Sequence, residues 1–290
     1  SNVPKLRFKE GDVSAFPERE KITLGETADR AVRWSITGGP FGSDLKTDDY
    51  TDNGVRIIQL QNIGDGKFLD DYAIYTSTKK ADQLIACNIY AGEMIISKMG
   101  DPVARCCLMP ETSKRYLMAS DGIRYVPDGK KYNKEYLFQF INYRDFRKQA
   151  LQRSTGSTRK RIGLSDLKSL KIHAPIKQEQ NKIAAFLTAV DTKIEQLTRK
   201  EELLKQYKKG VMQKIFSQEI RFKADDGSEF PEWDHVKLGN LIIQESKRNR
   251  DKKIGLVLSV SNKKGFITQA EQFDDYEVAS KDTSNYKVVA

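Results

Sequence analysis

The sequence has few of the residues that build redox centres and metal sites. It contains three cysteines, Cys87, Cys106 and Cys107, and two histidines, His173 and His235. An odd number of cysteines without a zinc-type spacing argues against a disulfide framework and a zinc cluster, and the two histidines are far apart in sequence. We therefore interpret all five residues as structural and expect neither a metal nor a cofactor.

Long apolar runs are also missing. The longest begins at Ile183 and ends at Val190, which is far shorter than the roughly 20 residues that cross a bilayer, and no secretory signal opens the chain. The sequence predicts a cytoplasmic protein without a membrane-spanning segment. With 290 residues, 38% of them hydrophobic, the chain can form one large or two ordinary domains with real cores.

Familiar catalytic motifs are absent as well. We find no P-loop, no dinucleotide fingerprint and no Ser-His-Asp or Cys-His set in a plausible context. Asp128, Asp166 and Lys168 loosely follow the acidic, acidic, lysine pattern by which metal-dependent nucleases hold a divalent ion. Because so short a pattern arises easily by chance, we expect a binding protein and not an enzyme. A nuclease or modification enzyme with its own active site is the alternative.

Positive charge is what the sequence has in excess. Fifty lysines and arginines stand against forty aspartates and glutamates, which leaves a net charge of +10. Such a balance favours a polyanionic partner, and nucleic acid is the first candidate.

Residues 178–217 predict one long helix with an apolar seam. At 1.5 Å per residue the 38 residues from 178 to 215 would be about 57 Å long, which is typical of a spacer that forms a coiled coil. The alternative is an ordinary amphipathic helix that packs along its own domain. Glu201 and Lys208 interrupt the seam. Its apolar members follow heptad spacing and are Ile183, Leu187, Val190, Ile194, Leu197, Leu204, Val211 and Ile215.

Short motifs recur 214 residues apart, which predicts an internal duplication. The chain therefore divides into a first domain over residues 1–174, a spacer helix over residues 175–218 and the incomplete beginning of a second domain over residues 219–290. The paired motifs are Leu-Arg-Phe-Lys at 6–9 with Ile-Arg-Phe-Lys at 220–223, Phe-Pro-Glu at 16–18 and 230–232, and Leu-Gly at 24–25 and 238–239.

Strand and helix patterns in the first domain predict a mixed α/β (α+β) fold with a hairpin-rich, mixed sheet. Residues 134–152 have the apolar spacing of one amphipathic helix, whose aromatic residues we expect in the core. Residues 256–262 of the second copy loosely repeat the first strand and its turn. The strand-like segments of the first domain are residues 55–62, 93–98, 104–109 and 170–174.

The richest polar segment is the loop at residues 154–161. Small hydroxyl residues and a glycine let backbone N–H groups approach phosphates, and three consecutive cations supply charge. We interpret it as the best DNA contact, the alternative being a solvated basic loop without a ligand. Its residues are Ser154, Thr155, Gly156, Ser157, Thr158, Arg159, Lys160 and Arg161.

A second glycine-rich loop, residues 37–43, also permits close backbone approach. It lacks the Gly-Lys-Ser/Thr of a P-loop. Its candidate DNA contacts are Gly39, Phe41, Gly42 and Ser43. Further along, Gln59, Gln61 and Asn62 carry amides that suit adenine edges, although alternation along a strand lets only one face reach a base.

Five segments together resemble the specificity subunit of type I restriction–modification enzymes. Lys98 and Arg105 lie in the segment at residues 92–105, and we add them to the candidate DNA contacts. The segments are residues 3–8, residues 34–43 with Gly-Pro-Phe-Gly-Ser, residues 92–105 (Gly-Glu-Met-Ile-Ile-Ser-Lys-Met-Gly-Asp-Pro-Val-Ala-Arg), residues 154–161 and residues 176–184 (Ile-Lys-Gln-Glu-Gln-Asn-Lys-Ile-Ala).

The resemblance implies a subunit that recognises double-stranded DNA without catalysing its modification or cleavage. In that family a recognition domain and a helix are followed by a second domain and a second helix, and the two helices pack antiparallel. Methyltransferase (modification) subunits and a restriction subunit are the implied partners. With an incomplete second half, a lone chain should not read a two-part target. A homodimer through the long helix is a further expectation, and a coiled-coil adaptor without a DNA role is the remaining alternative.

Overall fold

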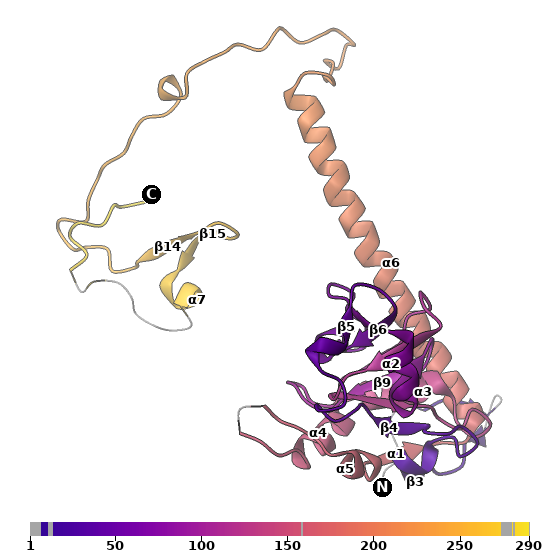
Figure 1. Ribbon diagram of the computed structural model, residues 1–290. Coiled ribbons are helices and arrows are strands. Elements are labelled where there is room, and N and C mark those ends of the chain that lie inside the picture. Colours follow the sequence, from indigo (N-terminus) through magenta and orange to yellow (C-terminus); the bar gives the residue numbers. More distant parts are fainter. Residues whose placement is uncertain (1–6, 11–13, 158, 274–279, 281, 290) are drawn as a thin grey trace. The chain divides into compact units, whose positions relative to one another are not determined.

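The computed structural model describes residues 7–10, 14–157, 159–273, 280 and 282–289. The chain divides into two compact units, residues 1–210 and 211–290. Figure 1 shows the first unit as a globular part with a long helix, and the second with a small hairpin. None of the described helices combines the length and apolar character needed to span a membrane.

Two sheets form the centre of the first unit. One is fully antiparallel, and the other is mixed, because β6 and β11 run parallel; the predicted mixed sheet is confirmed. The antiparallel sheet has the order β10 (Cys106–Leu108), β9 (Met94–Ser97), β12 (Gly122–Tyr125) and β4 (Ile36–Gly38). The mixed sheet has the order β5 (Tyr50–Thr51), β7 (Ile74–Thr76), β6 (Val55–Ile58), β11 (Arg115–Met118) and β8 (Asn88–Tyr90).

Strands from both ends of the domain pair with each other. β3 (Glu20–Thr23) lies antiparallel to β13 (Lys171–Ala174), so the strand predicted at 170–174 is present. A capping box between Thr23 and Glu26 then begins the short helix α1 (Leu24–Thr27). The other short elements are β1 (Lys9–Glu10), β2 (Ser14–Ala15), α2 (Thr78–Gln83), α5 (Leu164–Lys168), and the 3-10 turns η1 (Thr47–Asp49), η2 (Leu60–Asn62) and η3 (Ile85–Cys87).

The strand predicted over residues 55–62 ends earlier, at Ile58. Asn62 is buried, and its amide accepts the Gln59 N–H at 3.0 Å and donates to the carbonyls of Leu69 and Tyr72 at 3.0 and 2.8 Å. These bonds favour a turn over an extended chain, because the amide satisfies backbone groups that a sheet would otherwise pair. The prediction that this strand continues to residue 62 was therefore wrong.

The single helix predicted over residues 134–152 is two helices, α3 (Lys134–Asn142) and α4 (Arg144–Gln152). Tyr143 has extended dihedrals between them. The Asn142 amide binds both backbone groups of Cys106, at 3.1 and 3.2 Å, and Arg147 Nε donates to the Ile141 carbonyl at 3.0 Å. Tertiary bonds therefore end α3 where the apolar spacing alone continues.

The helices close the core over the antiparallel sheet. Of the expected core positions of α3 and α4, Tyr136, Leu137, Ile141 and Phe146 are buried and pack with strand residues such as Ile96 and Tyr125, whereas Phe140 is only partly buried. Cys106 and Cys107 are also buried. Each large apolar side chain removed from water in this way stabilises the fold by roughly 1.5–3 kcal/mol.

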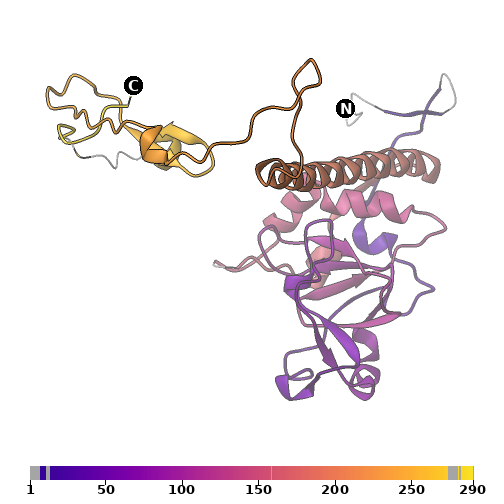
Figure 2. The ribbon, with the colours of Figure 1, turned by 90° about the horizontal axis from the view of Figure 1, so that it is seen from above.

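The long helix α6 (Lys177–Phe216) begins on the domain and then continues past it (Figure 1). Its bounds differ from the predicted 178–217 by one residue. Figure 2 shows α6 beside α3, where the Gln139 amide donates to Asp191 at 2.7 Å. Glu179, Gln180 and Ala184 are buried, whereas residues 188–209 are exposed. The helix is therefore docked at its beginning and free of its own domain further along.

In the second unit the described elements are η4 (Leu238–Asn240), the hairpin of β14 (Leu258–Ser261) and β15 (Gly265–Thr268), and α7 (Gln269–Phe273). Among its described residues only Asn249 is buried.

The predicted repeat has a common local structure. Lys9 pairs with Ala15, and the positions 214 residues later, Lys223 and Glu229, form the same antiparallel bridge. Arg7 and Arg221 each donate to the carbonyl of the proline ten residues on. The two copies thus share a hairpin register as well as a motif.

Candidate DNA interface

A cavity of about 560 Å³, here called the polar cavity, gathers candidates from distant parts of the sequence. It brings together the glycine-rich loop, the end of β6, the turn before β10 and the basic loop. Residues expected to contact DNA that line it are Phe41, Gly42, Gln59, Gln61, Arg105 and Arg159. The sequence analysis missed Met99, although it lies in the segment at residues 92–105, and also Tyr50, Ser120 and Asp121, which have no motif around them to mark them.

The glycine-rich loop is held tightly against the turn between β11 and β12. Gly39 N–H donates to the Gly122 carbonyl at 2.9 Å, and a Cβ on Gly39 would lie 1.8 Å from the Ala119 carbonyl oxygen. Only glycine fits there. Phe41 projects from this loop with 82% of its surface exposed. Ser43 is exposed and lies outside the cavity lining.

The basic loop is closed by paired backbone bonds between Thr155 and Arg161, both of 2.9 Å. Gly156 has φ of 96°, and a Cβ there would lie 2.5 Å from the Arg159 carbonyl oxygen, so the turn requires glycine. Ser154 Oγ donates to the Ala150 carbonyl at 2.7 Å, and Ser157 is exposed. Thr158 lies outside the described residues. A closed loop presents its cations in a defined position.

The three cations of the loop differ in their surroundings. Arg159 and Lys160 are exposed, and Arg159 lines the polar cavity. Arg161 lies 3.5 Å from the Asp121 carboxylate. Lys98 is half-buried and outside the lining; its Nζ donates to the Ser120 carbonyl at 2.8 Å. Burial, and then the charge of Arg161, lower the pKa of Lys98. Lys98 therefore holds the turn at Ser120 that borders the cavity.

Arg105 presents unpaired donor capacity to the cavity. Its backbone is fixed by Ser97, whose Oγ accepts the Arg105 N–H at 3.0 Å. Within the described part of the chain, the buried Nε of Arg105 has no hydrogen-bond partner. A buried guanidinium nitrogen without a partner is costly.

Of the three amides considered for base contacts, two reach the cavity. Gln61 Nε2 lies 3.3 Å from Gln59 Oε1, so the two amides form a pair at the cavity wall. Asn62 is buried and its amide is fully engaged in the turn. The hypothesis that Asn62 contacts a base is therefore wrong, and its role is to position Gln59 and Gln61.

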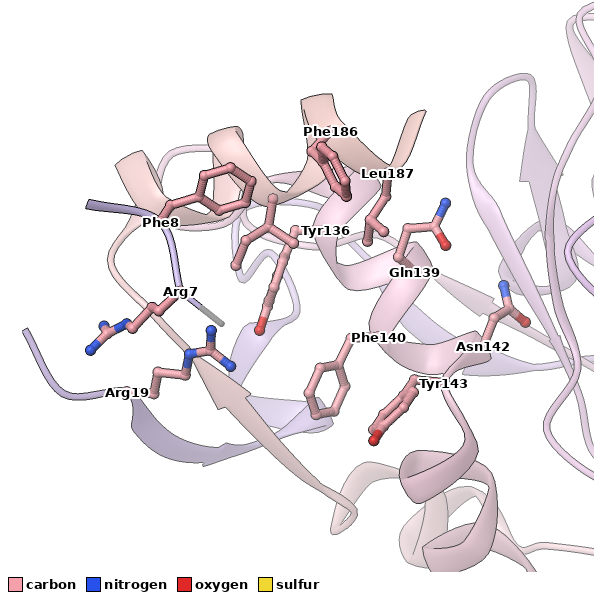
Figure 3. Close-up of a pocket in the computed structure, with 11 residues that line it drawn as sticks. Arg7, Phe8, Arg19, Tyr136, Gln139, Phe140, Asn142, Tyr143, Phe186 and Leu187 are labelled. Carbon is pink, nitrogen blue, oxygen red and sulfur yellow. The ribbon is translucent and has the colours of Figure 1, made fainter. Parts of the chain in front are cut away.

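The long helix carries a second candidate surface. Ile183 and Leu187 line an apolar groove of about 750 Å³ together with Phe186, Phe8 and Tyr143 (Figure 3). Phe8 packs on Phe186 with ring centroids 5.9 Å apart. Further along the seam, Val190, Ile194, Leu197 and Leu204 are exposed, and Val211 and Ile215 are partly exposed. The seam is thus an apolar stripe that its own domain covers only at the beginning.

A buried carboxylate ties the beginning of α6 to the N-terminal segment. Glu179 has no exposed surface; it accepts hydrogen bonds from Arg7 at 2.9 and 2.6 Å and from Arg19 at 3.1 Å. Figure 3 shows both arginines at one end of the groove. Burial would raise the pKa of Glu179, but the bonds from the two arginines outweigh it and lower the pKa.

The two aspartates of the nuclease alternative lie on separate elements. Asp128 Oδ1 accepts the Lys130 N–H at 2.9 Å, and Asp166 lies in the first turn of α5. Among the residues that the structure describes, no group of three or more histidine, cysteine, aspartate or glutamate side chains is placed to hold a metal ion.

Comparisons with known proteins agree on one family. The chain is 21% identical over 221 residues to the type I restriction enzyme MjaVIII specificity subunit of Methanocaldococcus jannaschii, covering 74% of this chain and 50% of the relative. It is 24% identical over 243 residues to the putative MjaX specificity subunit of the same organism, covering 80% and 55%. The chain therefore spans about half the length of these curated relatives.

A solved S subunit of a type I restriction–modification system from M. genitalium aligns with a TM-score of 0.48 and 19% identity, over 74% of this chain and 49% of that chain. Residues 41–206 match the family model described as the type I restriction modification DNA specificity domain. Because that match covers more than half of the 290 residues, the chain belongs to the family of type I restriction modification DNA specificity domains.

Proposed function

We propose that this chain is a sequence-specific DNA-recognition part of a type I restriction–modification specificity subunit, and that it reads one half-site without catalytic activity of its own. The observation that carries the proposal is the polar cavity, which combines paired amides with arginines on a family member's domain. Amides and guanidinium groups are the side chains that distinguish base pairs in the major groove.

The residues divide between phosphate and base contacts. Arg159 and Lys160 are exposed on a closed loop, which suits phosphate contacts that fix the position of the duplex. Gln59 and Gln61 suit an adenine edge, and Arg105 suits the acceptors of guanine. Gly42 and Ser43 are exposed and allow the backbone of their loop to approach the sugar–phosphate chain, whereas Gly39 holds that loop against Ala119 and Gly122.

The proposed partners are methyltransferase subunits and a restriction subunit. The named relatives are specificity subunits of type I restriction enzymes, which supports a chain that places catalytic subunits on DNA. In this proposal residues 1–174 are the recognition domain, residues 175–218 the spacer, and residues 219–290 the beginning of a second domain. Since the proposed substrate is cellular DNA, we also assign the chain to the cytoplasm.

The seam of α6 supports a homodimer through two antiparallel helices. An apolar stripe exposed over Val190, Ile194, Leu197 and Leu204 requires a covering partner. In an antiparallel pair, Glu201 of one chain opposite Lys208 of the other gives a reciprocal ion pair and therefore a register. Such a pair specifies alignment more than it adds stability.

A selection of bound duplexes from a random pool, with the modification subunits present, tests the recognition function. A recovered consensus with salt-dependent affinity is the expected result. Recovery of no consensus would overturn it, and a chain that binds no DNA would favour the adaptor. Duplex incubated with the chain and Mg²⁺, or with S-adenosylmethionine, should stay uncut and unmethylated. Cleavage that Asp128→Ala abolishes would restore the nuclease alternative.

A further inference from the structure

Phe41 is the most exposed large hydrophobic side chain among the described residues of the first unit, at 82% of its surface. A phenylalanine of this exposure forgoes the stabilisation that burial of its ring would contribute. Scattered exposed apolar residues are ordinary, but this ring stands at the rim of the polar cavity. The exposed position of the Phe41 ring beside the polar cavity therefore requires a physical reason.

The backbone on both sides of Phe41 is held in place by the domain. Pro40 is buried, and its ring fixes φ on one side. Gly39 is locked against Ala119 and Gly122, and the Asp44 N–H donates to the Phe41 carbonyl at 2.9 Å. The ring is thus held outward by a fixed loop, which is the geometry of a preorganised contact.

The neighbours of Phe41 indicate what the ring meets. Gln59, Gln61, Arg105 and Arg159 line the same cavity and offer amide groups and positive charge. An apolar protein surface would leave these groups unpaired, which is costly. A duplex has anionic phosphates, polar base edges and an apolar stack of bases, so it matches the cations, the amides and the ring together.

We propose that Phe41 is a wedge that enters the base stack at the recognised half-site and unstacks one base step. This inference rests on the proposed DNA-recognition function. Insertion of an apolar side chain costs the stacking free energy of the step, which burial of the ring and closer contacts offset. Pyrimidine–purine steps unstack most easily, so the wedge would select such a step without a hydrogen bond to it.

The test uses the full chain with its modification subunits and the duplex recovered by selection. 2-Aminopurine, whose fluorescence rises on unstacking, replaces one base at a time. The wild type should brighten the probe at one step only. Phe41→Ala should abolish that signal and weaken binding about ten- to a hundredfold, from the worth of one aromatic stacking contact. Phe41→Leu, which keeps an apolar wedge, should retain most of the signal.

Two other results would overturn the wedge while leaving the recognition function intact. In the first, the wild type binds its consensus tightly, no position brightens, and Phe41→Ala binds as well. In the second, Phe41→Ala weakens binding although the wild type brightens no probe, which makes Phe41 a groove contact. A wild type without sequence preference would instead remove the recognition function itself. Because the side chain is exposed, thermal unfolding of Phe41→Ala should match the wild type.

Discussion

Side-chain amides end a strand and a helix of the first unit, and one of the two turns that result lies at the polar cavity. Asn62 turns the chain after β6 by binding Gln59, Leu69 and Tyr72, and Asn142 ends α3 by binding Cys106. Each amide replaces backbone bonds that a longer strand or helix would make. At this scale the charged residues divide into those that hold loops, such as Lys98, and those that stay free for a ligand.

Arg159 and Lys160 are among the charged residues that stay free for a ligand, so replacing them tests the proposed phosphate contacts. Replacing both, or all three cations including Arg161, with alanine should weaken binding to every duplex and lower the slope of log affinity against log salt by up to about 0.9 per lost contact. Binding measured at several salt concentrations provides the check. Lys200→Ala on α6 is the matched control, and an unchanged slope in the loop variants would contradict the assignment.

Glu179 gives a pH prediction. Its pKa is lowered in the fold, so its contribution to stability is complete above the unfolded carboxyl pKa of about 4.3 and is lost as pH falls through the lower folded pKa. At neutral pH, Glu179→Gln should cost at most about 3–5 kcal/mol, because Arg7 and Arg19 remain partly exposed.

Denaturant unfolding of the wild type and Glu179→Gln between pH 7 and pH 3 measures this contribution. The difference between the two proteins should shrink below about pH 4.3. Glu202→Gln, which breaks an exposed pair with Arg199, is the control and should show no such pH dependence. A constant difference across the range would contradict the role of the carboxylate.

At the scale of elements, α6 is a docked amphipathic helix at its beginning and a spacer with an exposed apolar seam further along. Its beginning packs on α3 and the N-terminal segment through Glu179, Gln180 and Ala184, as an ordinary docked helix would. Its seam from Val190 onward has no cover within its own domain. A helix of 40 residues can do both, because its length of about 60 Å exceeds the domain that holds its beginning.

Leu197→Asp tests whether the seam forms an interface between helices. A carboxylate in an apolar seam has no partner and should shift the chain from dimer to monomer in light scattering at micromolar concentration. Leu203→Asp is the matched control, since Leu203 has similar exposure but lies off the seam, and it should remain dimeric. A wild type that is already a monomer would rule out the helix-mediated dimer.

At the scale of the whole molecule, antiparallel helices would give the dimer a two-fold axis. Two identical recognition domains should then read two inverted copies of one half-site, separated by a fixed gap. The selected consensus checks this directly, and Leu197→Asp should bind a single half-site more weakly. A consensus with two different half-sites would mean that a different second domain completes the assembly.

Much of the architecture followed from periodicity and repetition in the sequence. Heptad spacing predicted α6 to within one residue at each end, and motifs 214 residues apart predicted an internal duplication, whose two copies share the register of an antiparallel pairing. Cys106 and Cys107 are buried, as their interpretation as structural residues implied. These features depend on local spacing, which the chain carries without reference to its tertiary contacts.

The polar cavity depended on tertiary structure. Gln59, Arg105 and Arg159 are distant in sequence and meet only because the sheets bring three turns to one place. Asp121 and Tyr50 also line the cavity, although no sequence motif marks them. Asn62 is no longer a candidate for a base contact, because its buried amide makes hydrogen bonds inside the fold. Local spacing determines helices and strands, because their bonds join neighbours along the chain. A binding surface joins residues from far apart, so long-range packing decides which side chains remain free.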